Sequence, residues 1–256
     1  MDSQNKIIKI TLALALGLVG LMWLVFGYDT IFHLDLYKYG VKPRTFSGLL
    51  GIITSPFIHS TNGYSHIFNN SIPAFVLTWL LFYNYRNIAF KVFIILFLGT
   101  GLLVWIFGRD SYHIGMSGVI YGLTSFLMIC GFLTKNLSVA AISLLVIFLY
   151  GSLIWGIFPL TPGVSFEGHF FGFFVGAILA ILFRKQLPQP IKYRYEIEEE
   201  LADEMERLES QLGEEYWKIP ETPAPHTVIH PHSSTDPLNI VYQFKVKVNK
   251  DEEKKS

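Results

Sequence analysis

Long apolar stretches, separated by short polar connections, recur along the first 185 residues of the chain. A helix needs about 20 apolar residues to cross the core of a bilayer, because each residue advances about 1.5 Å along the axis. Six stretches come near that length, although Asn69, Asn70 and Pro73 interrupt the second. The pattern therefore predicts six spanning helices, approximately Ile7–Tyr28, His66–Tyr83, Lys91–Gly108, Ile114–Thr134, Leu137–Phe158 and Val164–Phe183.

The first stretch has a second interpretation as a secretory signal peptide. Lys6 and Lys9 precede it, and Val25-Phe26-Gly27 could form a cleavage site. The apolar core of a signal peptide usually has roughly 7–15 residues, and this stretch is longer. We therefore favour a membrane-spanning helix.

Lysine and arginine in the connections predict the orientation of the spans, because cytoplasmic loops of membrane proteins are enriched in these residues. Seven basic residues would share one side of the membrane and four the other. The larger set is Lys6, Lys9, Arg86, Lys91, Lys135, Arg184 and Lys185, and the smaller set is Lys38, Lys42, Arg44 and Arg109. The bias predicts that both termini lie in the cytoplasm.

Two segments outside the apolar stretches have patterns of their own. The connection over about residues 29–65 is too short and too apolar for a soluble domain, so we expect an interfacial segment partly sunk among lipid headgroups, with a plain surface loop as the alternative. Over about residues 195–215, acidic side chains and apolar ones at helical spacing predict an amphipathic helix. The expected fold is an all-α integral membrane protein, with a six-helix core over residues 1–185 and a partly flexible cytoplasmic tail over residues 186–256.

Composition and charge narrow the function. Hydrophobic residues make up 51% of the chain and the mean hydropathy is +0.40, as expected for a membrane protein. The 20 basic and 20 acidic residues balance, so no basic surface predicts a nucleic-acid partner. Cys130 is the only cysteine, which excludes a disulfide within the chain and a thiolate metal cluster. We expect neither a metal nor a cofactor.

Polar side chains inside the apolar stretches are the candidates for chemistry, because each is costly to bury in a membrane. Ser117 lies near the start of the fourth stretch, in Gly115-Met116-Ser117-Gly118. His169 lies near the start of the sixth, in Gly168-His169-Phe170-Phe171-Gly172. Each motif also has a purely structural explanation, because small residues let membrane helices pack closely and a histidine can simply bond a backbone carbonyl.

A third candidate is the pair His66 and Asn70 at the head of the second stretch. Their spacing places both side chains on one face of a helix, and both offer N–H donors. Capping of the helix by Ser65, with incidental polar neighbours, is the structural alternative.

The three candidates would lie at one depth, because the second, fourth and sixth spans all run inward from the non-cytoplasmic face. His66, Ser117 and His169 each fall in the first turn or two of their span, within roughly 10 Å of that face. A serine needs a neighbouring base to become a nucleophile, and its oxyanion needs donors, for which His66, Asn70 and the Ser117 N–H are candidates. No acid lies at matching depth, so the pattern predicts a serine–histidine dyad, with Tyr121 placed to hold the imidazole.

Taken together, these motifs resemble those of the rhomboid intramembrane proteases. The resemblance covers about residues 7–185 and rests on Gly115–Gly122, His66–Asn70 and Gly168–Gly176, with Pro43–His59 similar to the approach to the second helix in bacterial members. It implies a serine endopeptidase of a bacterial cytoplasmic membrane. Such an enzyme cleaves membrane-anchored proteins in or near their transmembrane segments, through a dyad and an acyl-enzyme.

The resemblance also implies roles for single residues. It makes Ser117 the nucleophile and His169 the general base, and it makes transmembrane substrates and membrane lipids the partners. The oxyanion hole would comprise His66, Asn70 and Ser117, with Tyr121, Gly115, Gly118 and Gly172 in support. Two departures stand out: the gap from His59 to His66 is about two residues longer than usual, and Arg44 lacks its usual neighbouring tryptophan.

Two other functional classes have less support in the sequence. A zinc protease would normally carry His-Glu-x-x-His, which is absent, and His59, His66 and His169 have no carboxylate at matching depth. A multi-pass binding protein or transporter without proteolytic activity is the non-enzyme alternative. A transporter would be expected to show charged residues in mid-helix or related halves, and the sequence shows neither.

Overall fold

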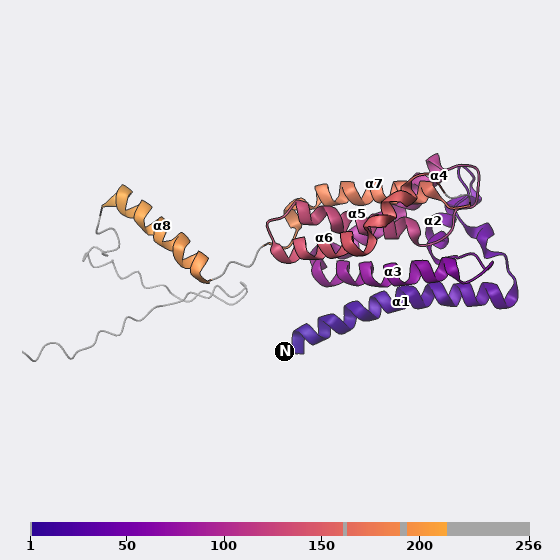
Figure 1. The fold of residues 1–256 in the computed structure, drawn as a ribbon, viewed down its shortest axis with the longest axis horizontal. Helices are drawn as coiled ribbons and strands as arrows, with labels where there is room; N and C mark the ends of the chain where they lie inside the picture. Colours follow the sequence, from indigo (N-terminus) through magenta and orange to yellow (C-terminus); the bar gives the residue numbers. More distant parts are fainter. Residues whose placement is uncertain (1, 161–162, 190–193, 214–256) are drawn as a thin grey trace, which may run out of the picture. The chain divides into compact units, whose positions relative to one another are not determined.

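The computed structural model describes residues 2–160, 163–189 and 194–213 (Figure 1). Within these ranges the regular elements are α-helices and 3₁₀-helices, with one isolated antiparallel bridge between Val41 and His113. The predicted all-α fold is therefore confirmed for the described residues. The chain divides into two compact units, Met1–Tyr193 and Arg194–Ser256, which are considered separately.

The helices of the first unit follow the apolar stretches of the sequence in order. They are α1 (Asp2–Phe32), α3 (Ser65–Asn84), α4 (Arg86–Phe107), α5 (Ser117–Phe132), α6 (Leu137–Tyr150) and α7 (Phe166–Leu182). The fifth stretch changes character at Gly151, where α6 gives way to the 3₁₀-helix η4 (Gly151–Ile157). Among the described residues, Gln4–Phe32, Arg86–Phe107 and Leu137–Ile157 are long and apolar enough to cross a membrane, and the count of six spans stays a prediction.

The core of this unit lies around α5, where every residue from Gly118 to Leu127 is buried. The closest packing is between α5 and α7. A Cβ added at Gly172 would lie 1.9 Å from the carbonyl oxygen of Gly118, so the two backbones meet without intervening side chains. Leu24, Phe90 and Phe148 of the outer helices are exposed, as expected where lipid takes the place of water.

Helix α1 lies beside α3 and runs in the opposite direction (Figure 1). The indole N–H of Trp23 in α1 donates a hydrogen bond to the Ser71 hydroxyl in α3, at 3.0 Å. Trp23 also packs edge-on against Phe68, with the ring centroids 5.0 Å apart. This contact fixes the first helix against the one that carries His66.

The connection between α1 and α3 consists of short helical segments rather than a plain loop. These are η1 (Leu36–Tyr39), η2 (Ser47–Leu49), α2 (Gly51–Thr54) and η3 (Ser55–Phe57). The Arg44 guanidinium donates to the carbonyls of Ile106 and Gly108 at the end of α4, at 3.2 and 2.8 Å. Phe46 is 91% exposed, so one apolar side chain of this connection faces outward, and its interfacial position stays a prediction.

A tryptophan accompanies Arg44 after all, but it comes from a distant element. Trp105 in α4 donates its indole N–H to the carbonyl of Thr45 at 2.8 Å, and its own carbonyl accepts from the Arg44 N–H at 2.9 Å. The missing neighbour in the sequence is thus replaced by one across the fold.

The second unit contains α8 (Arg194–Leu212), close to the amphipathic helix predicted over about residues 195–215. Ile197, Leu201, Met205 and Leu212 are exposed on it. The flexible remainder expected for the tail falls on residues 214–256, which lie outside the described ranges.

Candidate active site

The starts of α3, α5 and α7 meet at one end of the first unit, which brings together the polar side chains singled out in the sequence. Ser117 is the first residue of α5, and Gly115 just before it adopts φ +103°, a conformation that side chains other than glycine rarely accept. The Gly115 N–H donates to the Ser55 carbonyl at 2.8 Å. The turn into α5 is therefore fixed against the segment that leads to α3.

Ser117 and His169 touch. The Nε2 atom of His169 lies 2.8 Å from the Ser117 hydroxyl oxygen, and its Nδ1 atom lies 2.9 Å from the carbonyl oxygen of Gly156. A carbonyl can only accept, so Nδ1 carries the proton of the neutral ring and Nε2 accepts from the serine O–H. The carbonyl bond that was the structural alternative for His169 thus coexists with the serine bond and fixes the tautomer that a general base needs.

Tyr121 holds the imidazole from its flat side. The two rings are parallel within 3° and their centroids are 4.1 Å apart. The Tyr121 hydroxyl also abuts Gly156, where an added Cβ would lie 1.8 Å from that oxygen. The His169 imidazole is therefore held by a stacked ring and by the carbonyl of Gly156, where a larger residue would overlap the Tyr121 hydroxyl.

His66 presents an N–H toward the same place. The Ser60 N–H donates to His66 Nδ1 at 3.2 Å, so in the neutral ring the proton resides on Nε2. That Nε2 lies against Gly115, where an added Cβ would be 2.8 Å away. Asn70 donates one amide N–H to the His66 carbonyl at 2.8 Å, which leaves its second N–H for another acceptor.

These groups line one cavity of about 540 Å³ that includes Ser117, His66, Asn70, Tyr121 and His169. The Ser117 N–H belongs to the first turn of α5, where backbone N–H groups have no partner within the helix. The cavity therefore combines a paired hydroxyl and imidazole with N–H donors from two helices.

His59 lies behind His66 rather than in the cavity. It is 1% exposed, and the centroids of the two imidazoles are 5.0 Å apart. Burial, followed by the proximity of His66, lowers the pKa of His59 to about 4, so it is neutral near pH 7. Despite the longer gap in the sequence, the ring of His59 packs against the ring of His66.

The two acids near these motifs form ion pairs with Arg109 and Lys42. The expectation that no acid lies at this depth is wrong for Glu167, whose second carboxylate oxygen is buried without a hydrogen-bond partner in the described part of the chain. Glu167 is buried in the first turn of α7, where its Oε1 accepts from the Arg109 N–H at 3.3 Å and lies 3.4 Å from the Arg109 Nε. Asp110 pairs with Lys42 at 2.7 Å, and the hydrogen bond from that lysine lowers the pKa of the carboxyl. Both ring nitrogens of His169 already have other partners, so neither acid is hydrogen-bonded to this ring.

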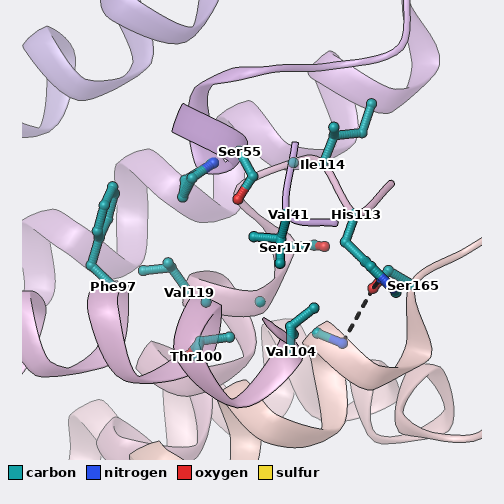
Figure 2. Close-up of a pocket in the computed structure, with 15 residues that line it drawn as sticks. Val41, Ser55, Phe97, Thr100, Val104, His113, Ile114, Ser117, Val119 and Ser165 are labelled. Atoms are coloured by element: carbon teal, nitrogen blue, oxygen red, sulfur yellow. Dashed lines mark hydrogen bonds between the residues drawn. The ribbon is translucent and has the colours of Figure 1, made fainter. Parts of the chain in front are cut away.

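A smaller cavity of about 40 Å³ lies on another side of Ser117 (Figure 2). His113 and Ser165 line it together with Ser117, and the Ser165 hydroxyl accepts from the Gly168 N–H at 3.3 Å. These residues were not singled out in the sequence, because a histidine in a connecting loop and a serine before a helix are common. Gly156 was missed too, since a backbone carbonyl leaves no mark on the sequence.

Comparisons with known proteins point to one family. Residues 47–186 match the model of the Rhomboid domain. Uncharacterized proteins of Mycobacterium tuberculosis and Mycobacterium bovis are each 32% identical over 177 residues, which cover 65% of this chain and 72% of theirs. An uncharacterized protein of Mycobacterium leprae is 28% identical over 176 residues, which cover 65% of this chain and 69% of that protein.

Proposed function

Because this chain belongs to the rhomboid family, we propose that it is an intramembrane serine endopeptidase that cleaves membrane-anchored proteins in or near their transmembrane segments. The observation that carries the proposal is the 2.8 Å contact between the Ser117 hydroxyl and His169 Nε2. The opposite ring nitrogen is occupied by the Gly156 carbonyl, so the imidazole faces the serine in its basic form.

In the proposed reaction, the Ser117 oxygen attacks the carbonyl carbon of the scissile peptide bond while its proton passes to His169 Nε2. The resulting tetrahedral intermediate carries a negative oxygen. His169 then gives the proton to the leaving amine, and the C–N bond breaks to leave an acyl group on Ser117. A water molecule attacks this ester with His169 as base, and the return of the proton to the serine oxygen releases the carboxylic acid product.

The negative oxygen would be met by the Ser117 backbone N–H, the His66 Nε2–H and the second amide N–H of Asn70. Donors fixed in advance stabilise such an oxyanion because they need no reorganisation during the reaction. His66 is fixed by the Ser60 N–H, and Asn70 by its bond to the His66 carbonyl. The tautomer of His66 is the one that donates into the cavity.

The family and the apolar helices make this chain an integral membrane protein. The short loops and the bacterial-like motifs favour a bacterial cytoplasmic membrane, and the distribution of lysine and arginine favours both termini in the cytoplasm. Its substrates would be other membrane-spanning chains, which reach the 540 Å³ cavity from the membrane or its surface.

The decisive experiment combines cleavage of a transmembrane reporter with labelling by a fluorophosphonate. Both Ser117→Ala and His169→Ala should abolish cleavage in the purified full chain, and Ser117→Ala should also abolish labelling. Ser65→Ala is the matched control, because it removes another hydroxyl from the same cavity. A Ser117→Ala variant that still cleaves, or a folded wild-type chain that neither cleaves nor reacts, would refute the proposal.

The oxyanion assignment has its own test. Replacing Asn70 with alanine should lower kcat by roughly 10- to 1000-fold, the range expected for one lost donor. Asn69→Ala is the control, because Asn69 lines the cavity beside it but is exposed. Equal rates for the two variants would remove Asn70 from the oxyanion hole.

A further inference from the structure

Two hydrogen bonds join the same pair of segments at successive levels. Ser117 bonds His169 at 2.8 Å, and His113 bonds Ser165 at 2.6 Å. Both bonds join positions 52 residues apart, so each member of the second pair lies four residues before a member of the first. In α7 this offset is one helical turn, and the N–H of His169 donates to the Ser165 carbonyl at 3.4 Å.

The directions of the hydrogen bonds around His113 follow from its partners. Its Nε2 lies 3.1 Å from the Arg109 carbonyl oxygen, which can only accept, so Nε2 carries the proton. Nδ1 then accepts from the Ser165 hydroxyl, whose oxygen in turn accepts from the Gly168 N–H. His113 and Ser165 therefore each donate one side-chain hydrogen bond and accept one.

His113 is 5% exposed, and burial lowers the pKa of its imidazole. The ring is therefore neutral near pH 7, as this pattern of bonds requires. The charged groups around it are Glu167 of α7, Arg109 of its own loop and Lys42 of the connection between α1 and α3.

The backbone of His113 is fixed as firmly as its side chain. Its N–H and carbonyl both pair with Val41, each at 2.9 Å. The same loop is tied to the start of α7 by Arg109, whose guanidinium pairs with Glu167 and donates to the Val164 carbonyl. The loop before Ser117 is therefore attached to the connection between α1 and α3 on one side and to α7 on the other.

On the opposite side of the dyad, α5 and α7 touch through Gly118 and Gly172. The Ser117–His169 contact is thus bracketed by the His113–Ser165 bond before it and by the glycine contact after it. Rotation or translation of either helix start would have to break one of these flanking contacts.

We propose that His113 and Ser165 are positioning residues for the dyad, and that their hydrogen bond sets the separation of Ser117 from His169. This inference rests on the proposed protease function. The nucleophile and the base come from different helices, so their separation depends on the contacts between those helices. A misplacement of about 1 Å can cost roughly 100-fold in rate.

The test measures kcat and KM for reporter cleavage in the purified full chain. His113→Phe keeps the Ser165 hydroxyl as the cap of α7 but removes the bond, and it should lower kcat by roughly 10- to 100-fold with KM changed less than about twofold. At position 165, threonine and valine form a pair of equal shape. Ser165→Thr should stay within about threefold of the wild-type kcat, while Ser165→Val should fall as far as His113→Phe.

The double variant H113F/S165V separates a shared bond from two independent effects. If both residues act through their mutual bond, the double variant should lose no more activity than either single variant. Losses that multiply would overturn the inference, and so would a wild-type kcat in His113→Phe. If His113→Phe does not fold, the threonine and valine pair alone decides, and equal kcat values for that pair refute the inference.

Failure of the inference differs from failure of the proposed function. If the wild-type chain cleaves the reporter and the His113→Phe variant cleaves it equally fast, only the positioning role is refuted. If the wild-type chain neither cleaves the reporter nor reacts with the fluorophosphonate, the protease assignment itself is refuted.

Discussion

The substitution Gly156→Ala tests whether the carbonyl bonded to His169 matters for the reaction. Gly156 lies in η4, and its Cα faces the Tyr121 hydroxyl. An added Cβ would lie 1.8 Å from that oxygen, 2.9 Å from Tyr121 Cζ and 3.3 Å from His169 Nδ1. Ordinary contact begins near 3.4 Å, so the backbone and the tyrosine hydroxyl must separate by about 1.6 Å.

Such a shift cannot be absorbed without loss at the dyad. If η4 moves, the 2.9 Å bond from His169 Nδ1 to the Gly156 carbonyl breaks, and the ring is free to rotate or to exchange tautomers. If Tyr121 moves instead, the stacked ring at 4.1 Å is displaced. Because a misplacement of about 1 Å can cost 100-fold, we expect kcat to fall by roughly 100-fold.

The assay is cleavage of the transmembrane reporter at saturating substrate, with thermal unfolding in detergent as the folding control. Gly151→Ala is the matched variant in the same 3₁₀-helix, because its Cβ would meet only Ile147, at an ordinary 3.7 Å. It should retain the wild-type kcat. Adding Tyr121→Phe to Gly156→Ala removes the worst overlap and should recover part of the loss. Equal kcat values for Gly156→Ala and Gly151→Ala would refute the role given to this carbonyl.

Three further predictions concern the fold. The pKa of His59 is about 4 in the folded chain and 6.5 when free, so its contribution to stability is full above pH 6.5 and is lost as the pH drops toward 4, by up to about 3 kcal/mol. His59→Phe should therefore reduce the fall of the thermal unfolding temperature between pH 7 and pH 4, and a fall as steep as in the wild type would contradict this. Gly172→Ala would press a methyl group onto the Gly118 carbonyl and should lower the unfolding free energy by about 1–3 kcal/mol. The control Gly99→Ala has its nearest contact at 3.6 Å and should be tolerated, and equal unfolding midpoints for the two variants would count against close backbone packing. Asn136 caps α6, because its side chain accepts from the N–H groups of Ser138 and Val139, at 2.9 and 3.3 Å. Asn136→Ala should therefore lower the free energy of unfolding in denaturant by about 1–2 kcal/mol and leave kcat unchanged. A stability within error of the wild type would show that this cap contributes nothing.

The sequence by itself determined the long helices of the first unit, although not the short ones between α1 and α3. Apolar length is a local property, so the ends of α3, at Ser65 and Asn84, lie one residue from the predicted span. The largest difference is at the end of α6, which stops at Tyr150 rather than Phe158, and the next largest are at polar helix starts. α1 begins at Asp2 rather than Ile7, and α4 begins at Arg86 rather than Lys91. A helix continues into polar residues that an apolar pattern cannot count.

The sequence also indicated which side chains would meet. His66, Ser117 and His169 each occur near the start of a predicted span, and spans that run in the same direction place their starts at one membrane face. That argument needs only the rise of a helix and the alternation of directions. Ser117 and His169 lie at the same end of the helices, as their predicted depths required. Equal depth alone does not say that the two side chains touch.

Only the tertiary structure decided how these side chains are held. The partner of His169 Nδ1 is a carbonyl 13 positions away, and every residue has a carbonyl, so no residue type marks it. The His113–Ser165 bond joins positions 52 residues apart, and Trp105 reaches Thr45 across 60. Such partners are selected by the packing of helices against one another, a long-range property that local patterns of polarity do not contain.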